Sequence, residues 1–411
     1  MSKLPITARG LLLLIVINIL IRGAWLLYMH PPQALDFEWY FTHASQLAAG
    51  QGYHTGNLYT AYWPIGYPFF LSLIFRIMGP SVIAGLITNA VLSVGIVVLV
   101  YLMGLKLTGS ERIGMFAALG YTILPSQIEW NSVLGSEELF TALLLLSLYI
   151  YLFTYRKGAW KVVLLSGFIL GLACDVRPIP LLFPGVIWLY EVFVRRQPIR
   201  VATVRALLLF VGIAVAVSPV TIRNFIALHH FVLISTNGGV VLWQGTKTDS
   251  AYFWSWNPHM NPLLAAGRNE VVESAIGTHV FIQHVLQHPM WTVVHGVVKW
   301  MFLYLVDWNV VGVTFYMNSN PPVSSVVTVA MWFDTIVYWM WMVICVIGLW
   351  KGLREYTVSW KTIALPISYI LYNTAIFAVF PAWDRFRYPM MPLYAICFGF
   401  GIFALVRKSP G

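Results

Sequence analysis

The sequence predicts an all-α polytopic membrane protein with about ten transmembrane helices. Hydrophobic residues make up 59% of the 411 residues, and charged residues only 10%. The mean hydropathy is +0.76, and apolar runs recur along most of the chain. Each span is expected to be a helix because a helix satisfies its own backbone hydrogen bonds inside the bilayer.

The first expected span, 11–29, follows a short basic N-terminus. Arg22 interrupts it and no small-residue cleavage site follows, so we interpret it as an uncleaved span rather than a signal peptide. The further expected spans are 81–107, 112–127, 138–155, 161–177, 179–195, 205–222, 325–350, 361–382 and 389–407.

Charged residues are distributed unequally between the two sets of connecting segments. With the N-terminus inside, the cytoplasmic segments hold 16 of the 25 Lys and Arg residues, in agreement with the positive-inside rule. This bias explains most of the net charge of +10 without nucleic acid as a partner. The outer side holds 11 of the 15 acidic residues, which favours chemistry on that face. The three cysteines lie in or beside apolar runs, with no spacing typical of a disulfide framework or a zinc site.

Two outer segments are long, 30–80 and 223–324. In the first, apolar residues at helical spacing predict a short surface helix from Asp36 to Ala49, which Gly50 and Gly52 end. Residues 67–79 are short for a span and are expected to form a shallow helix. In the second segment, 291–306 is expected to be amphipathic or re-entrant. No repeat is visible, and we expect one integral membrane module, 1–411, without a C-terminal soluble domain.

The most informative stretch is the start of the first outer segment, with the pattern D-x3-Y-x3-A-x2-L-x2-G-x-G-Y from Asp36 to Tyr53. It places Asp36, Glu38 and Tyr40 just past the first span. Ionisable groups at a membrane are costly and are functional candidates by default. The segment Tyr62-Trp-Pro-Ile-Gly-Tyr67-Pro follows as a bent, interfacial stretch.

Further polar clusters stand at the outer ends of spans. Ser136-Glu137-Glu138 either carries chemistry or forms a helix N-terminus, with Ser136 as N-cap and acids in the first turn. The other clusters are Arg223-Asn224, Asp384-Arg385-Phe-Arg387-Tyr-Pro and, ranked lower, Arg177-Pro178.

The outer arginines, Arg223, Arg385 and Arg387, oppose the positive-inside trend. A guanidinium stays charged and can bind phosphate oxygens bidentately, so these residues are candidates for phosphate recognition. The alternatives are interfacial snorkelling and pairing with Asp384.

Aromatic and amide side chains accompany these clusters. Trp243 and its neighbours up to Asn261 suit either a sugar-binding surface or an interfacial aromatic belt. We expect sugar or loop contacts from Tyr40, Tyr62, Tyr67, Trp243 and Asn224.

These motifs, in this order from about residue 10 to the end, resemble the GT-C fold glycosyltransferases that use polyprenyl-phosphate sugars, related to aminoarabinose transferase and protein O-mannosyltransferases. The resemblance implies an undecaprenyl- or dolichyl-phosphate sugar donor, inversion at the anomeric carbon, and transfer outside a bacterial plasma membrane. The expected acceptor is a lipid, glycan or protein. Asp36 matches the family's catalytic base in the first loop, and Glu137 matches the acidic position of the second outer loop.

The remaining expected roles follow from this resemblance and from residue chemistry. Glu38, Glu137 and Glu138 would orient substrates, and Glu38 beside Asp36 is a second candidate for the base. The sequence requires no cofactor, although Mg²⁺ or Mn²⁺ on Asp36 and Glu137 is possible. The arginines would hold the donor phosphate.

Three other functions stay open from the sequence. A surface-glycan polymerase or ligase would share the lipid-linked donor and use the large loop 223–324. A transporter or flippase would favour ionisable groups deep in the membrane, where only Arg22 and Asp334 are expected, and a repeat of spans. A non-catalytic membrane scaffold would tolerate loss of all polar clusters.

Overall fold

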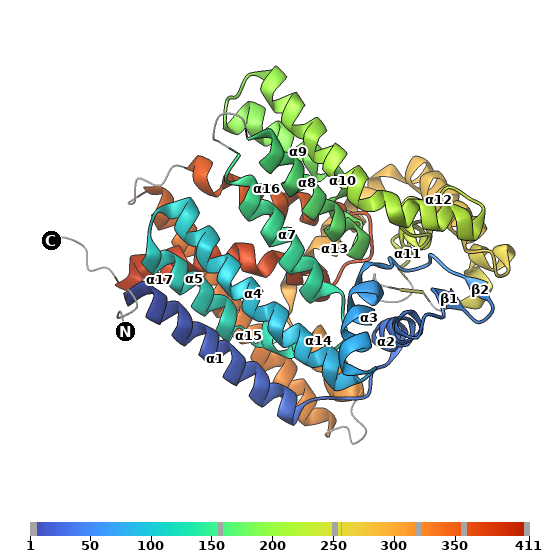
Figure 1. The fold of residues 1–411 in the computed structure, drawn as a ribbon, viewed down its shortest axis with the longest axis horizontal. Coiled ribbons are helices and arrows are strands. Elements are labelled where there is room, and N and C mark those ends of the chain that lie inside the picture. Colours follow the sequence, from blue (N-terminus) through green and yellow to red (C-terminus); the bar gives the residue numbers. More distant parts are fainter. Residues whose placement is uncertain are drawn as a thin grey trace.

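The computed structural model describes residues 6–154, 159–248, 254–255, 257–317, 323–354 and 360–406. Within these ranges the chain is almost wholly helical (Figure 1). The strands among them are β1 (His54–Thr55) and β2 (Leu58–Tyr59), which pair as a small antiparallel hairpin. The all-α polytopic membrane fold predicted from the sequence is therefore confirmed.

Five long helices are apolar enough to cross a membrane unaided. They coincide with five expected spans and are α1 (Ile6–Tyr28), α4 (Val82–Thr108), α10 (Ile199–Leu228), α15 (Ser324–Arg354) and α17 (Met391–Val406), which continues from the 3₁₀ segment η6 (Asp384–Met390).

The other five expected spans are shorter or interrupted. They correspond to α5 (Glu111–Ile123), α7 (Glu137–Tyr151), α8 (Trp160–Val176), α9 (Phe183–Leu189) between η2 (Ile179–Leu182) and η3 (Tyr190–Val194), and α16 (Trp360–Ile376). At 1.5 Å per residue the longest of these reaches only about 25 Å, less than the roughly 30 Å hydrocarbon core. Among the described residues, half of the expected spans are therefore shorter than a full crossing of the hydrocarbon core.

Proline accounts for one of these interruptions. Leu124 precedes Pro125 and is extended, with φ −71° and ψ 119°, because a residue before proline is disfavoured in the helical region. The expected span 112–127 therefore ends at Ile123. The chain continues as α6 (Pro125–Glu129) and η1 (Trp130–Ser132).

The segment expected to be amphipathic or re-entrant is a bent helix pair. Helix α13 (Pro289–Leu305) and helix α14 (Asn309–Met317) meet at a bend of 68°, and together they are long and apolar enough for one span. A broken span and a re-entrant loop both fit this geometry.

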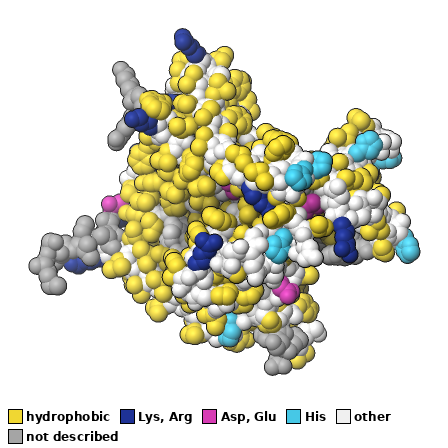
Figure 2. Space-filling model, turned by 45° about the vertical axis from the view of Figure 1, so that its right-hand side comes forward, with side chains coloured by type: hydrophobic (Ala, Val, Ile, Leu, Met, Phe, Trp, Pro, Cys, Tyr) yellow, Lys and Arg dark blue, Asp and Glu magenta, His cyan; other side chains and the backbone are white. Residues whose placement is uncertain are grey.

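Hydrophobic side chains gather on the left and upper part of the face seen in Figure 2, as expected for a surface in contact with lipid. Helix α1 shows how the polar exceptions are accommodated. Asn18 and Arg22, one turn apart, are both fully buried. Arg22 donates to the carbonyl oxygens of Thr122 and Gln127, at 3.4 and 3.2 Å, so its charge faces the protein and not the lipid.

The outer segments form a cap at one end of the bundle, on the right in Figure 1. Helix α2 (Leu35–Ala48) is the predicted surface helix, and it packs on α3 (Gly66–Met78), the predicted shallow helix. Gly50 and Gly52 end α2 with φ of +74° and +90°, a region that favours glycine. The second outer segment adds α11 (Gly238–Gln244), η4 (Pro258–Met260), η5 (Pro262–Ala266) and α12 (Glu270–Gln287).

Candidate functional site

Three elements that are far apart in the sequence meet at one charged cluster. Asp36 lies in the first turn of α2, Glu137 begins α7, and Arg385 lies in η6. Arg385 Nη1 donates to Asp36 Oδ2 at 3.0 Å, and Arg385 Nε donates to Glu137 Oε1 at 2.6 Å. One guanidinium therefore joins the two carboxylates that the sequence singled out.

A second guanidinium completes the cluster. Arg177, directly after α8, donates through Nη2 to Glu137 Oε1 at 2.5 Å and through Nε to Ser136 Oγ at 2.9 Å. Ser136 is at the predicted N-cap position of α7, with Glu137 and Glu138 in the first turn, but its side chain makes no cap bond. Its hydroxyl accepts from Arg177 instead. The available signal for Arg177 was an arginine at the outer end of an apolar run, which the sequence analysis ranked too low.

Two glycines allow the elements to approach closely enough for these contacts. A Cβ on Gly66, the first residue of α3, would clash with the backbone of Asp175 near the end of α8. A Cβ on Gly135 would clash with the Glu137 carboxylate. Glu137 also gains from its place in the first turn of α7, where the helix dipole favours a negative charge.

Exposure is graded across the cluster. The Asp36 side chain is 34% exposed, Arg177 12%, Arg385 9% and Glu137 1%. The Arg385 guanidinium lies 4.9 Å from the ring of Phe37 and 5.5 Å from the ring of Trp130, which shield it from solvent. An incoming molecule therefore meets the Asp36 carboxylate first.

Tyr40 and Tyr67 form the buried wall behind Asp36. Their rings meet edge to face with centroids 5.2 Å apart, and Tyr67 donates a long hydrogen bond of 3.5 Å to Asn89. Burial raises the pKa of Tyr40 to about 12, and Asp36 adds to that rise. Tyr40 is thus a neutral phenol packed under the charged cluster.

The other two predicted acids take different positions. Glu38 is exposed, and its carboxylate makes no contact recorded among the described residues. Glu138 is buried at 1% exposure and accepts a hydrogen bond from Asn131 Nδ2 at 3.0 Å, inside the bundle. Only Glu137 of the pair 137–138 reaches Asp36 through Arg385, so the predicted orienting role of Glu138 is not supported by its position.

Arg223 and Asn224 do not join the cluster. Arg223 donates to the carbonyl oxygens of Thr60 and Tyr53 at 2.6 and 2.7 Å. Asn224 donates to the carbonyl oxygens of Val232 and Ile234, at 3.2 and 3.0 Å. Backbone oxygens of the segments 30–80 and 223–324 already accept from these donors. Phosphate binding by Arg223 and sugar contact by Asn224 therefore stay predictions, at positions apart from the cluster.

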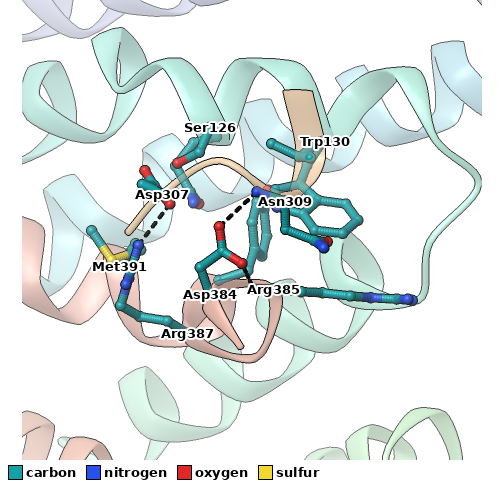
Figure 3. Close-up of a pocket in the computed structure, with 11 residues that line it drawn as sticks. Ser126, Trp130, Asp307, Asn309, Asp384, Arg385, Arg387 and Met391 are labelled. Atoms are coloured by element: carbon teal, nitrogen blue, oxygen red, sulfur yellow. Dashed lines mark hydrogen bonds and ion pairs between the residues drawn. The ribbon is translucent and has the colours of Figure 1, made fainter. Parts of the chain in front are cut away.

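The Arg387 side chain also makes its contacts with other residues of the protein. It is 1% exposed and pairs with Asp307 at 2.6 Å (Figure 3). The guanidinium also lies 3.9 Å from the centre of the Tyr338 ring. Although it lies two residues from Arg385, Arg387 makes its contacts inside the protein, and its binding of the donor phosphate stays a prediction.

Of the aromatic residues predicted to contact sugar, some are buried and others are partly exposed. Trp243 is 1% exposed and packs against Val240 and Leu263, so it is a core residue of the outer cap. Tyr62 packs on that small core while staying partly exposed, and its ring meets Trp63 edge to face at 5.6 Å. Of these residues, Tyr62 remains available to a substrate.

The residues present do not fit a divalent ion between Asp36 and Glu137. The facing oxygens of both carboxylates are bonded to Arg385, which lies where such an ion would be held. Within the described ranges, no three His, Cys, Asp or Glu side chains are grouped closely enough to bind a metal. We therefore derive no catalytic step through a metal ion.

Residues 63–222, which include Glu137 and Arg177, match the family described as dolichyl-phosphate-mannose-protein mannosyltransferase. No curated protein sequence matches the chain. Among solved structures, it is similar to the oligosaccharyltransferase AglB from Archaeoglobus fulgidus in complex with an inhibitory peptide and a dolichol-phosphate. The identity is 12% and the TM-score 0.59, over 97% of this chain and 50% of AglB.

A structure of the Archaeoglobus fulgidus oligosaccharyltransferase, tethered with an acceptor peptide containing the NVT sequon, is 14% identical with a TM-score of 0.57. It is matched over 96% of this chain and 49% of the oligosaccharyltransferase chain. ArnT from Cupriavidus metallidurans bound to undecaprenyl phosphate is 11% identical with a TM-score of 0.46, over 95% of this chain and 77% of ArnT.

The likeness to AglB concerns the fold. This chain spans about half the length of AglB, and nearly all of its own length takes part in the match. AglB is a GT-C glycosyltransferase, and the all-helical membrane architecture described above agrees with that class. The chain is therefore a polytopic membrane protein with the GT-C fold.

Proposed function

We propose that this protein is an inverting glycosyltransferase. It moves a sugar from a polyprenyl-phosphate donor to an acceptor hydroxyl or amine on the extracytoplasmic side of a bacterial plasma membrane. The observation that carries the proposal is the charged cluster itself. A partly exposed Asp36 is joined through Arg385 to a buried Glu137, at the end of the bundle where the outer segments gather.

Asp36 acts as the general base. The acceptor oxygen or nitrogen forms a bond to the anomeric carbon while the bond from that carbon to the phosphate oxygen breaks. The acceptor proton passes to an Asp36 carboxylate oxygen, and the bonding electron pair leaves with the polyprenyl phosphate. Attack opposite the leaving group inverts the anomeric centre. A positioned base typically contributes about 10²–10⁴-fold to such a step.

Arg385 and Arg177 receive the charge that develops on the phosphate. The recorded bonds of Arg385 use Nε and Nη1, and those of Arg177 use Nε and Nη2. Each guanidinium thus has a further nitrogen to offer to a phosphate oxygen. Such preorganised donors are worth roughly 10²–10³-fold each when charge builds up in the transition state.

The ion pair between Arg385 and Asp36 has a mechanistic consequence. While Arg385 donates to Asp36, the carboxylate is less available to take a proton. A donor phosphate that draws the Arg385 guanidinium toward itself frees Asp36 for the acceptor. Glu137, bonded to both arginines, limits how far Arg385 moves during this exchange.

The known proteins support the lipid-linked class of donor. AglB is described with a dolichol-phosphate, and the Archaeoglobus fulgidus oligosaccharyltransferase with an acceptor peptide. The family that matches residues 63–222 is described as dolichyl-phosphate-mannose-protein mannosyltransferase. We extend this to a polyprenyl-phosphate sugar donor here, with a lipid, glycan or protein as acceptor and membrane lipids around the bundle.

The test compares cells that carry the wild type, Asp36→Asn or Glu38→Gln, with mass spectrometry of lipid-linked sugars and envelope glycans. We expect Asp36→Asn to lose transfer by at least about 100-fold, so that one polyprenyl-phosphate sugar accumulates and one glycan decoration disappears. Asn keeps the size of Asp and accepts a hydrogen bond from Arg385, so the fold should survive.

Glu38→Gln is the matched control, because Glu38 lies in the same first turn of α2 and is exposed. It should leave both pools unchanged. Near-normal transfer by Asp36→Asn would exclude Asp36 as the base. If neither pool changes between Asp36→Asn and wild type while Glu38→Gln removes the decoration, the base is Glu38.

A further inference from the structure

The short segment η6 carries three charged side chains that serve three different places. Arg385 reaches outward to Asp36 and Glu137, whereas Asp384 and Arg387 reach the break between α13 and α14 (Figure 3). The catalytic cluster and the bent helix pair are thus connected through four consecutive residues.

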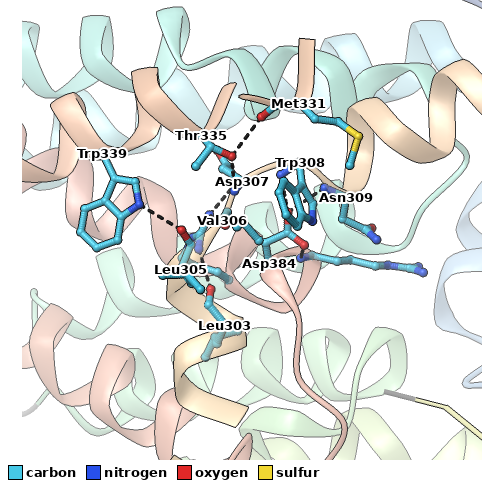
Figure 4. A network of polar contacts seen from close by, with 12 residues as sticks. Leu303, Leu305, Val306, Asp307, Trp308, Asn309, Met331, Thr335, Trp339 and Asp384 are labelled. Carbon is cyan, nitrogen blue, oxygen red and sulfur yellow. Dashed lines mark hydrogen bonds and ion pairs between the residues drawn. The ribbon is translucent and has the colours of Figure 1, made fainter. Parts of the chain in front are cut away.

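Asp384 binds the first backbone groups at the start of α14. Its Oδ2 accepts hydrogen bonds from the N–H groups of Trp308 and Asn309, at 2.6 and 2.7 Å (Figure 4). Its other oxygen, Oδ1, accepts from the backbone N–H of Arg385 at 3.1 Å. The same carboxylate therefore caps α14 and fixes the backbone from which Arg385 projects.

Arg387 binds the end of α13. It donates to the carbonyl oxygens of Leu303 and Val306 at 2.5 and 3.1 Å, and it pairs with Asp307 at 2.6 Å. A cation at a helix C-terminus also opposes the negative end of the helix dipole. The backbone of Asp307 is fixed in turn by Thr335 Oγ1 on α15, at 3.2 Å (Figure 4).

These side chains are packed against one another and leave no room for a ligand. The gap that they enclose with Ser126 and Gln127 is too narrow for a water molecule. Asp384 is 6% exposed and Arg387 1% exposed. Neither side chain can therefore touch a substrate in this arrangement, so any effect on transfer must pass through Arg385.

We propose that Asp384 and Arg387 are positioning residues, which anchor η6 to the α13–α14 break and so hold the Arg385 guanidinium between Asp36 and Glu137. This inference rests on the proposed function for its effect on turnover. Its structural part, the coupling of the break to the cluster, can be measured without any substrate. Misplacement of a catalytic group by about 1 Å can cost roughly 100-fold in rate.

The experiment compares Asp384→Ala with Asp384→Asn in purified, folded protein. Ala removes every acceptor, whereas Asn keeps one oxygen for the α14 N–H groups and is an equally good cap. We expect Asp384→Ala to lower kcat by about 100-fold with a much smaller change in the acceptor KM. Asp384→Asn should stay within a few-fold of wild type. Arg387→Met should behave like Asp384→Ala.

Glu191→Gln is the control for lost stability. Glu191 is also buried in an ion pair, with Arg205 at 2.8 Å, but on elements expected at the cytoplasmic side. It should lower the melting temperature while leaving kcat per folded molecule unchanged. A matching loss of kcat in this control would mean that destabilisation alone explains the Asp384 result, and the proposal would be overturned.

Hydrogen exchange supplies the readout that does not depend on sugar transfer. In Asp384→Ala, exchange should rise at residues 308–310 and also at the first turns of α2 and α7, which carry Asp36 and Glu137. In Glu191→Gln those turns should stay as in wild type. If exchange rises only at 308–310, the break is not coupled to the cluster and the proposal fails. Failure of wild-type transfer, by contrast, would count against the proposed function alone.

Discussion

At the scale of single residues, the charged cluster is balanced. Asp36 and Glu137 supply two negative charges, and Arg177 and Arg385 supply two positive ones. Three of the four side chains are nearly buried, so loss of one partner leaves an uncompensated charge, which typically costs about 3–5 kcal/mol. The cluster is therefore stable only as a set, and the partly exposed Asp36 is the member that can change partner at least cost.

The same pairing predicts that transfer does not need a divalent ion. Arg385 fills the position between the two carboxylates, so its fixed charge does the work that a metal would do on the phosphate. Extensive dialysis of the purified protein against EDTA should leave the rate of transfer within about two-fold of the untreated rate, a change of less than ~0.5 kcal/mol in the barrier.

Addition of Mg²⁺ or Mn²⁺ to the dialysed protein gives the opposing arm of this measurement. No increase in rate is expected. An inactive dialysed protein that Mn²⁺ restores would mean that Arg385 leaves the carboxylates when substrate binds, and that Asp36 and Glu137 then hold the ion themselves.

At the scale of elements, side-chain hydrogen bonds join the first outer segment, 30–80, to the second, 223–324. Glu270, at the start of α12, accepts from Thr60 Oγ1 at 2.8 Å and from Ala61 N at 2.6 Å. Arg223, in the last part of α10, donates to carbonyl oxygens of the same loop. These hydrogen bonds hold the β1–β2 hairpin beside α2, whose first turn carries Asp36.

Arg223→Ala should therefore loosen the hairpin without removing a phosphate contact. Hydrogen exchange should rise across residues 53–62, while the donor KM changes little and kcat falls. Arg385→Ala is the informative contrast, because it should alter donor binding and leave exchange at 53–62 unchanged. A large increase in donor KM for Arg223→Ala, with normal exchange in the hairpin, would restore Arg223 as a phosphate-binding residue.

The arginines show which parts of the site could be predicted from the sequence and which could not. Residue type and the charge bias singled out Asp36, Glu137 and Arg385, which the structure brings into contact, and the apolar runs located the five long helices. The sequence could not assign Arg223 and Arg387, because their partners are backbone carbonyls of segments more than 80 residues away. It also ranked Arg177 too low, since only the packing of α3 on α8 at Gly66 reveals that Arg177 lies beside Glu137.

At the scale of the whole molecule, the hydrophobic surface lies along the helix bundle, and the cap formed by the outer segments lies at one end of it. The long helices expose apolar side chains over their length, as on α1 with Leu13, Ile19 and Leu20. The hairpin and α12 project at one end, and the Glu191–Arg205 pair belongs to elements expected at the other. The positive-inside bias predicts that the hairpin end, and with it Asp36, lies outside the cell.

Cysteine labelling can measure this orientation directly. The three native cysteines are buried, so they should give little background with a membrane-impermeant maleimide. Leu58→Cys introduces a thiol in the hairpin, where Leu58 is 55% exposed, and Arg200→Cys introduces one at the exposed start of α10. In intact cells only Leu58→Cys should react, and after permeabilisation both should react. Reaction of Arg200→Cys alone in intact cells would place the charged cluster at the cytoplasmic face, where the donor and acceptor would then have to be sought.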